Sequence, residues 1–201
     1  MKKFKLVFCL ILAVICLFTV PSTNILAAGS EYNSESAAVQ TLYQKMVQAQ
    51  EQGVDINDFF KTLSTTEQKL AVKILTPTKE EVEINTTNTK DEQSTFTVTM
   101  NHKNIYGMTL CRYIQEITWR YDGIYITTSP QCVMVGTTAM LGWVYNGVTS
   151  SDEWGGQGDT EYRAYSQGSF TLNIGGWIIE SWYPAIDQYV YGDGDCYANT
   201  Y

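Results

Sequence analysis

The sequence has little of what common catalytic and nucleic-acid-binding sites require. It contains one histidine, His102, and no Cys-x-x-Cys pair, which disfavours a zinc site built from Cys and His. Lys and Arg number 13 against 21 Asp and Glu, so the formal net charge is −8. A chain this acidic does not bind nucleic acid by counterion release or anionic lipid through charge. A P-loop, a dinucleotide fingerprint and a nucleophile elbow are absent too.

What the sequence does contain is enough apolar material for a core. Hydrophobic residues make up 44% of the 201 positions and aromatic residues 13%. This composition excludes wholesale disorder. The length fits one domain with a small annex and is too short for two full-sized domains.

The first 28 residues resemble a secretory signal peptide. Three of the first five residues are lysines, residues 6–20 form an uncharged apolar run, and small residues end the segment at Ala27 and Ala28. A membrane anchor is the alternative, but the run is shorter than the roughly 20 residues that span a bilayer, and Pro21 ends it. We therefore expect a secreted protein that begins near Ala28 or Gly29, with no transmembrane segment in the mature chain.

Residues 31–77 have the pattern of a helical segment. Apolar residues recur at steps of three and four over residues 35–52, which predicts an amphipathic helix. Asp55 can cap a short second helix, and Ser64 with Glu67 has the spacing of a capping box that starts a third. Pro77 ends the last one. We expect these helices to pack on the rest of the domain; a detachable partner-binding helix is the alternative.

Residues 80–201 change to the period of β-strands. Phe96, Val98 and Met100 alternate with threonines, and aromatic, β-branched segments follow to the C-terminus with glycines between them. Residues 85–94 and 150–159 have loop-like compositions. The fold class predicted is mainly β, an antiparallel sandwich or barrel-like domain that follows the N-terminal helical segment.

Export makes disulfides possible, and Cys111 and Cys132 are the candidate pair. If Asp122 and Gly123 form a two-residue hairpin turn, Tyr113 lies opposite Cys132, and Cys111 is one diagonal away on the same face. A bulge near Pro130 would bring the two sulfur atoms together. Cys196 is then left over, although three cysteines allow three different single bridges.

Acidic residues and the lone histidine offer the candidates for chemistry. His102 has polar neighbours, which predicts an exposed turn. A carboxylate-dependent hydrolase would need two acidic residues, and the last third of the chain supplies several, including Asp152 and Glu153. Asp193 and Asp195 flank a glycine and form a weak calcium candidate, although the full twelve-residue calcium loop is absent.

Three functions agree with these observations. The first is a secreted, non-catalytic protein that binds at a cell surface or to a protein partner, including a bacteriocin-like antagonist. The second is a carbohydrate or cell-wall binding module, and the third is a small hydrolase. We expect the first, with no cofactor, and place the binding surface at Trp154, flanked by Asp152 and Glu153, because an aromatic ring in a glycine-rich loop is an efficient recognition anchor. The partner would be an envelope component, a glycan or a protein.

Overall fold

The fold is contained in residues 37–201. The computed structural model describes residues 30–89 and 93–201 of the chain, which divides into a unit of residues 1–36 and a second unit of residues 37–201. The predicted signal peptide, residues 1–28, and its cleavage site lie outside the described residues. The first helix of the described residues begins before this boundary, and every other helix and strand lies in the second unit.

Among the described residues, three helices precede the sheets, at the positions the sequence predicts. They are α2 (Ser30–Glu51), α3 (Ile56–Thr62) and α4 (Thr65–Leu75). The Asp55 side chain caps α3 by accepting from the backbone N–H of Asn57, and Ser64 and Glu67 form the predicted capping box of α4. These caps satisfy N–H groups that a first helical turn leaves without partners. No helix in the described part of the chain is long and apolar enough to cross a membrane.

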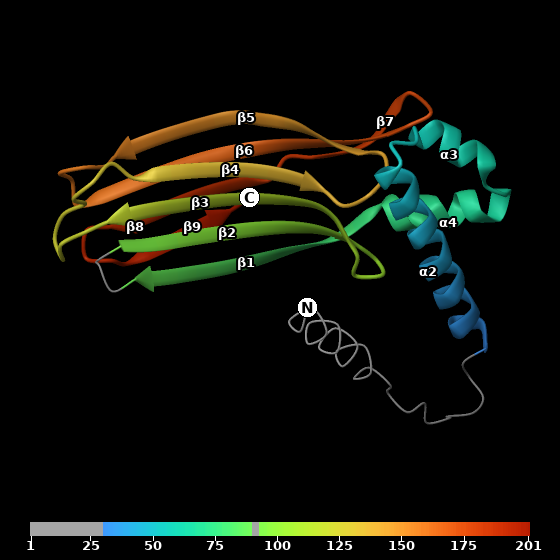
Figure 1. Cartoon of the computed structure of the whole chain (residues 1–201), viewed down its shortest axis with the longest axis horizontal. Helices are drawn as coiled ribbons and strands as arrows, with labels where there is room; N and C mark the ends of the chain where they lie inside the picture. The colour runs from blue at the N-terminus through green and yellow to red at the C-terminus, as the bar shows by residue number, and fades with distance from the viewer. Residues whose placement is uncertain (1–29, 90–92) are drawn as a thin grey trace, which may run out of the picture. The chain divides into compact units, whose positions relative to one another are not determined.

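Two antiparallel sheets make up the rest, which confirms the predicted mainly β, sandwich-like fold (Figure 1). The first sheet has the order β1 (Pro77–Thr89), β2 (Gln93–Asn104), β3 (Thr109–Arg120) and β4 (Gln131–Thr138). The second has the order β5 (Trp143–Gly155), β6 (Glu161–Ile174), β8 (Ala185–Tyr191) and β9 (Cys196–Thr200), and β7 (Trp177–Trp182) also pairs with β6.

Two segments predicted as loops are largely strand. Residues 85–89 continue β1 and pair with β2, and residues 150–155 continue β5 and pair with β6. In the first case, the threonines that give the segment its polar, loop-like composition are good strand formers, and one of them, Thr87, lies opposite Thr95 of β2. The polar composition therefore marks exposed strand, not a break in the sheet.

The predicted register of the hairpin between β3 and β4 is wrong. The ladder sets Cys132 opposite Ile117 and Cys111 opposite Thr138, because the strands join through a wider loop in which the last bridge is Tyr121 to Ile126. Cys111 and Cys132 do share a face, but six ladder positions separate them, about 20 Å at the usual strand rise. A disulfide needs Cα atoms within about 7 Å. The proposed bridge is not formed, and Cys111, Cys132 and Cys196 are all free thiols.

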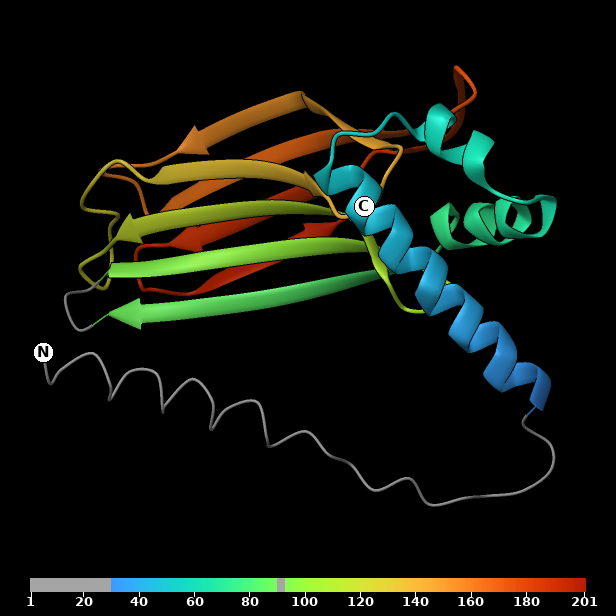
Figure 2. The same ribbon diagram turned by 45° about the vertical axis from the view of Figure 1, so that its right-hand side comes forward.

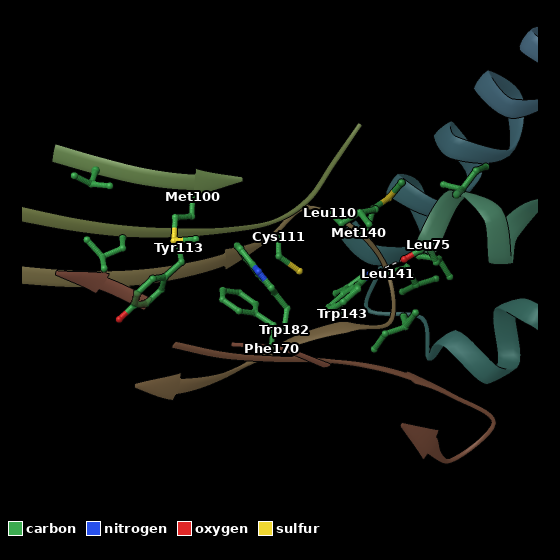
Figure 3. Close-up of a cluster of buried hydrophobic side chains, with 14 of the residues drawn as sticks. Leu75, Met100, Leu110, Cys111, Tyr113, Met140, Leu141, Trp143, Phe170 and Trp182 are labelled. Carbon is green, nitrogen blue, oxygen red and sulfur yellow. Dashed lines mark hydrogen bonds between the residues drawn. The ribbon is translucent and has the colours of Figure 1, made fainter. Parts of the chain in front are cut away.

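The core lies between the two sheets and continues beneath the helices. Tyr113, Phe170 and Trp182 are among the buried aromatic residues between the sheets (Figure 3). Toward the helices, the indole N–H of Trp143 donates to the carbonyl of Leu75 at the end of α4, over 3.1 Å. The helices pack at the end of the sheets where β7 lies (Figures 1 and 2). The rest of the outer face of the second sheet is left for solvent or a partner.

Candidate functional site

Trp154 lies on the outer face of the second sheet. It is the next-to-last residue of β5, its ring is 44% exposed, and it pairs with Arg163 of β6. The sequence predicted an exposed Trp154 on a loop. The exposure is confirmed, but a strand holds the residue, so its side chain has a fixed direction.

Three further side chains continue from Trp154 in one row across the sheet. Trp154 lies opposite Arg163, Arg163 opposite Tyr189 of β8, and Tyr189 opposite Tyr197 of β9. Directly opposite residues on adjacent strands point to the same face. We call this row, formed by Trp154, Arg163, Tyr189 and Tyr197, the cross-strand stack.

The members of the cross-strand stack lie face to face. The Arg163 guanidinium carbon is 4.5 Å from the Trp154 ring centroid and 5.0 Å from that of Tyr189. The rings of Tyr189 and Tyr197 are parallel within 7° at a centroid distance of 4.4 Å. Because these ring faces are turned toward one another, the middle of the stack presents ring edges and hydroxyl groups to solvent, and only the rings at its ends, Trp154 and Tyr197, have a second face outside the stack.

A buried carboxylate fixes the arginine of the stack. Arg163 donates from Nε and from one terminal nitrogen to the two oxygens of Asp187, each over 2.7 Å, and the Asp187 side chain is only 5% exposed. This bidentate pairing raises the pKa of the Arg163 guanidinium above its ordinary value. The Tyr189 hydroxyl also donates to Asp187, over 3.1 Å. Burial and the carboxylate raise the pKa of Tyr189, so this hydroxyl stays protonated near neutral pH and can donate to Asp187.

The two acidic neighbours predicted with Trp154 lie on opposite faces of β5. Asp152 is exposed two residues before Trp154, so the strand's alternation places it on the same face, opposite Tyr165. Glu153 lies on the other face and accepts a hydrogen bond from the Tyr162 hydroxyl over 2.7 Å. The structure therefore brings Asp152 to the candidate surface, and Glu153 lies apart from it.

The prediction that His102 lies on an exposed turn is wrong. His102 belongs to β2, and its side chain is only 12% exposed. Its imidazole stacks on Trp182 at 4.5 Å and meets Trp143 edge-on at 5.9 Å. The neighbours that suggested a turn are buried polar residues with partners: the Asn104 side chain, for instance, donates to the carbonyl of Ile74.

The surroundings of His102 favour a neutral imidazole. Burial lowers its pKa below 6.5, and Glu80 and Glu180 oppose this only in part. Its Nδ1 lies 3.6 Å from a Glu80 oxygen that already accepts from the Trp182 indole at 2.7 Å, and Nδ1 has no hydrogen-bond partner. Cys111 lies opposite on β3, but burial raises the pKa of its thiol far above the ordinary value. The pair thus lacks the activated thiolate of a cysteine nucleophile.

The calcium candidates form a turn. The carboxylate of Asp193 accepts from the backbone N–H of Asp195 over 3.0 Å, around Gly194 with a φ of 93°. Within residues 30–89 and 93–201, the acidic, histidine and cysteine side chains form no group of three or more that could hold a metal ion. The calcium hypothesis therefore gains no ligand set from the described residues.

Comparison with known proteins adds no relative: no family model, no curated protein and no solved structure matches this chain significantly.

Sequence reasoning found Trp154 and missed its three partners in the stack. The period-two spacing of Asp187, Tyr189 and Tyr191, and that of Arg163 and Tyr165, could have placed these residues on common faces of two strands. The row across four strands additionally depends on the pairing register. No local signal in the sequence gives that register.

Proposed function

We propose that this protein is a secreted, non-catalytic binding protein that docks through the cross-strand stack onto a protein partner at a cell surface. The observation that carries the proposal is the row of Trp154, Arg163, Tyr189 and Tyr197, in register across four strands, with exposed rings at both ends and half-buried side chains between them. Tryptophan, tyrosine and arginine are the residue types that contribute most at protein interfaces. Secretion rests on the charge and apolar pattern of the first 28 residues.

The preorganisation of the stack supports a binding role. Arg163 is held by two hydrogen bonds to Asp187, and Tyr189 stacks closely on Tyr197. Side chains that are already fixed lose little conformational entropy when a partner docks. The acidic residues Asp152 and Glu161 border the row, which favours a partner with basic groups.

The orientation of the rings favours a protein partner over a glycan. A sugar that stacks on an aromatic side chain needs a free ring face, whereas Tyr189, in the middle of the row, lies between Arg163 and Tyr197, and Trp154 turns one of its two faces to the guanidinium. Tyr197 turns a face to Tyr189. The edges and hydroxyl groups that remain suit hydrogen bonding and close packing against a protein surface.

The test compares the binding of three variants to intact cells and to protease-treated cells. Trp154→Ala and Tyr197→Ala should each weaken binding by about 30-fold, the effect of losing a hot-spot side chain. Their free energy of unfolding should change by less than about 1 kcal/mol, because both rings are largely exposed. Tyr125→Ala removes a similarly exposed ring, 48% against 44% for Trp154, from the loop between β3 and β4 and is the matched control.

Three results would contradict the proposal. The first is that Tyr125→Ala weakens binding as much as Trp154→Ala does. The second is that protease treatment leaves binding intact while glycan digestion abolishes it, which would support the carbohydrate alternative. The third is that the intact mass of the protein recovered from the producing culture still includes Met1 and the protein stays in the membrane fraction, which would exclude secretion.

A further inference from the structure

The hairpin that joins β6 to β7 carries an uncovered apolar tip. Asn173 pairs with Ile178 and Ile174 with Trp177, and Gly175 and Gly176 form the turn with φ values of 68° and 81°. We call residues 174–179 the hairpin tip. Figures 1 and 2 both show this hairpin projecting beyond the sheets, beside α3.

The exposed side chains lie on both faces of the hairpin. Trp177 is 76% exposed, Ile178 64% and Ile179 52%. Trp177 pairs with Ile174 and Ile178 with Asn173, so these two neighbours point to opposite faces, and Ile179 lies at an irregularity where the pairing skips one residue. Within the part of the chain that the structure describes, nothing covers these three side chains fully on either face.

We propose that the hairpin tip inserts into the interfacial region of a lipid bilayer. A protein partner or a second copy of this chain that docked on the hairpin would cover one face and leave apolar residues of the other in water. Immersion covers both faces at once. Tryptophan at the end of the hairpin fits this environment, because its amphipathic ring is enriched where a membrane meets water.

Most of the backbone of the hairpin tip already has hydrogen-bond partners within the protein, so it can enter the interface at little cost. The ladder between β6 and β7 pairs the two strands up to the turn except at Ile179, which the register skips, and the backbone N–H of Gly175 donates to the side chain of Asn57 in α3. Polar backbone groups without partners are what excludes irregular segments from lipid. This hairpin avoids that cost over most of its tip.

The distribution of charged residues determines how deeply the hairpin tip can insert and which type of lipid it should prefer. Residues 170–179 contain no ionisable side chain, and Glu180 is the first that follows. From the turn to Ile179 the strand extends about 10 Å, which matches interfacial burial and falls far short of the hydrocarbon thickness. With no basic residue in the tip and a net charge of −8, the protein should bind zwitterionic lipid at least as well as anionic lipid.

The hairpin tip is independent of the cross-strand stack. Arg163 lies near the start of β6 and the tip lies at its end, which places them about 35 Å apart along the strand. Variants of one surface should therefore leave the other intact.

The first test uses quenching of tryptophan fluorescence by phosphatidylcholine vesicles with brominated acyl chains. Bromine quenches only indoles close to the acyl chains, so the readout is specific for the part of the protein that is immersed. The full chain and its Trp154→Phe variant should be quenched alike, and Trp177→Phe should lose the quenching. Trp154→Phe is the matched control because it also removes one exposed indole. Absence of quenching in the unmodified chain, or equal quenching in Trp177→Phe, would overturn the proposal.

The second test measures sedimentation with unlabelled phosphatidylcholine vesicles. Ile178→Ser should lower the fraction bound by about tenfold, since it removes an apolar side chain that the interface would bury. Ile124→Ser is the control, because Ile124 is equally exposed, at 63%, in the loop between β3 and β4. Equal losses in the two variants, or binding that requires anionic lipid, would contradict insertion of the tip. A third result would also contradict insertion: the protein self-associates, Ile178→Ser abolishes this self-association, and the same substitution leaves binding to vesicles unchanged.

Discussion

His102 couples the stability of the fold to pH near neutrality. It is the chain's one histidine, and Trp143 and Trp182 enclose it together with carboxylates from Glu80 and Glu180. Burial lowers the pKa of its imidazole below 6.5, so between the two pKa values the unfolded chain binds more protons than the folded chain. The stabilisation is present above pH 6.5 and is lost as the pH falls below it.

We therefore expect the free energy of unfolding to decrease between pH 7 and pH 5, and His102→Phe to flatten this dependence. Phenylalanine keeps a ring against Trp182 and removes the titration. Urea unfolding at a series of pH values measures the effect. Glu67→Gln is a useful comparison: hydrogen bonds from Ser64 lower the pKa of Glu67 to about 2, so its contribution is lost only as the pH falls below about 4.5. A slope between pH 7 and 5 that is unchanged in His102→Phe would refute the assignment.

At the scale of elements, a glycine and an aromatic ring join the edges of the two sheets. Gly136 lies in β4, and the Tyr145 ring of β5 packs directly over it. A Cβ at position 136 would lie 2.3 Å from two ring carbons of Tyr145. The close approach of β4 and β5 thus depends on the missing side chain.

Gly136→Ala should destabilise the fold by about 1–3 kcal/mol, the usual cost of overpacking a core. Thermal or urea unfolding measures this directly. Thr137→Ala changes the next residue of the same strand, whose side chain is exposed, and should cost much less. Equal destabilisation by the two substitutions would show that the contact with Tyr145 is not the cause.

The elements also show where sequence reasoning succeeds. The caps of α3 and α4 are local signals, because Asp55, Ser64 and Glu67 bond within a few residues of themselves, and both helices begin as predicted. The register of β3 and β4 depends on how the chain turns after Tyr121. The predicted two-residue turn at Asp122 and Gly123 is wrong, because the last bridge joins Tyr121 to Ile126 and the loop between them is wider. A shift of a few residues preserved the shared face of Cys111 and Cys132 and removed their contact.

At the scale of the whole molecule, a buried polar network links the two sheets. The Tyr113 hydroxyl of β3 donates to Ser166 of β6 over 2.7 Å, and the Ser166 hydroxyl donates to the Gln115 side chain. The Gln115 amide in turn donates to the carbonyl of Ala164 over 2.9 Å. Burial raises the pKa of Tyr113 to about 12, so its hydroxyl stays protonated and can donate.

Tyr113→Phe should lower the free energy of unfolding by about 1 kcal/mol, the net value of a typical hydrogen bond, without changing the core's shape. Tyr162→Phe is the matched control, because that hydroxyl donates to the exposed Glu153 and water can replace the lost bond. Urea denaturation of both variants makes the comparison. A larger loss in Tyr162→Phe would contradict a linking role for the buried network.

Most of the candidate site could not be predicted from the sequence, because it depends on how the whole second sheet is assembled. Trp154 was identifiable as an exposed aromatic residue from its polar and glycine neighbours. The rest of the cross-strand stack exists because three separate pairings place Arg163, Tyr189 and Tyr197 in one row. Each pairing is decided by packing between strands, so the row appears only once the whole second sheet is assembled.

The strand order also has a kinetic consequence. Nearly every strand pairs with its neighbour along the chain, and the one pairing that skips a strand, β6 with β8, passes over only the short β7. Short connections keep the entropy of loop closure small at each step. Because local contacts speed folding, this sandwich should refold faster than sandwiches whose sheets are joined by long crossovers. It would then spend little time with unpaired strand edges, the state in which β-rich chains aggregate.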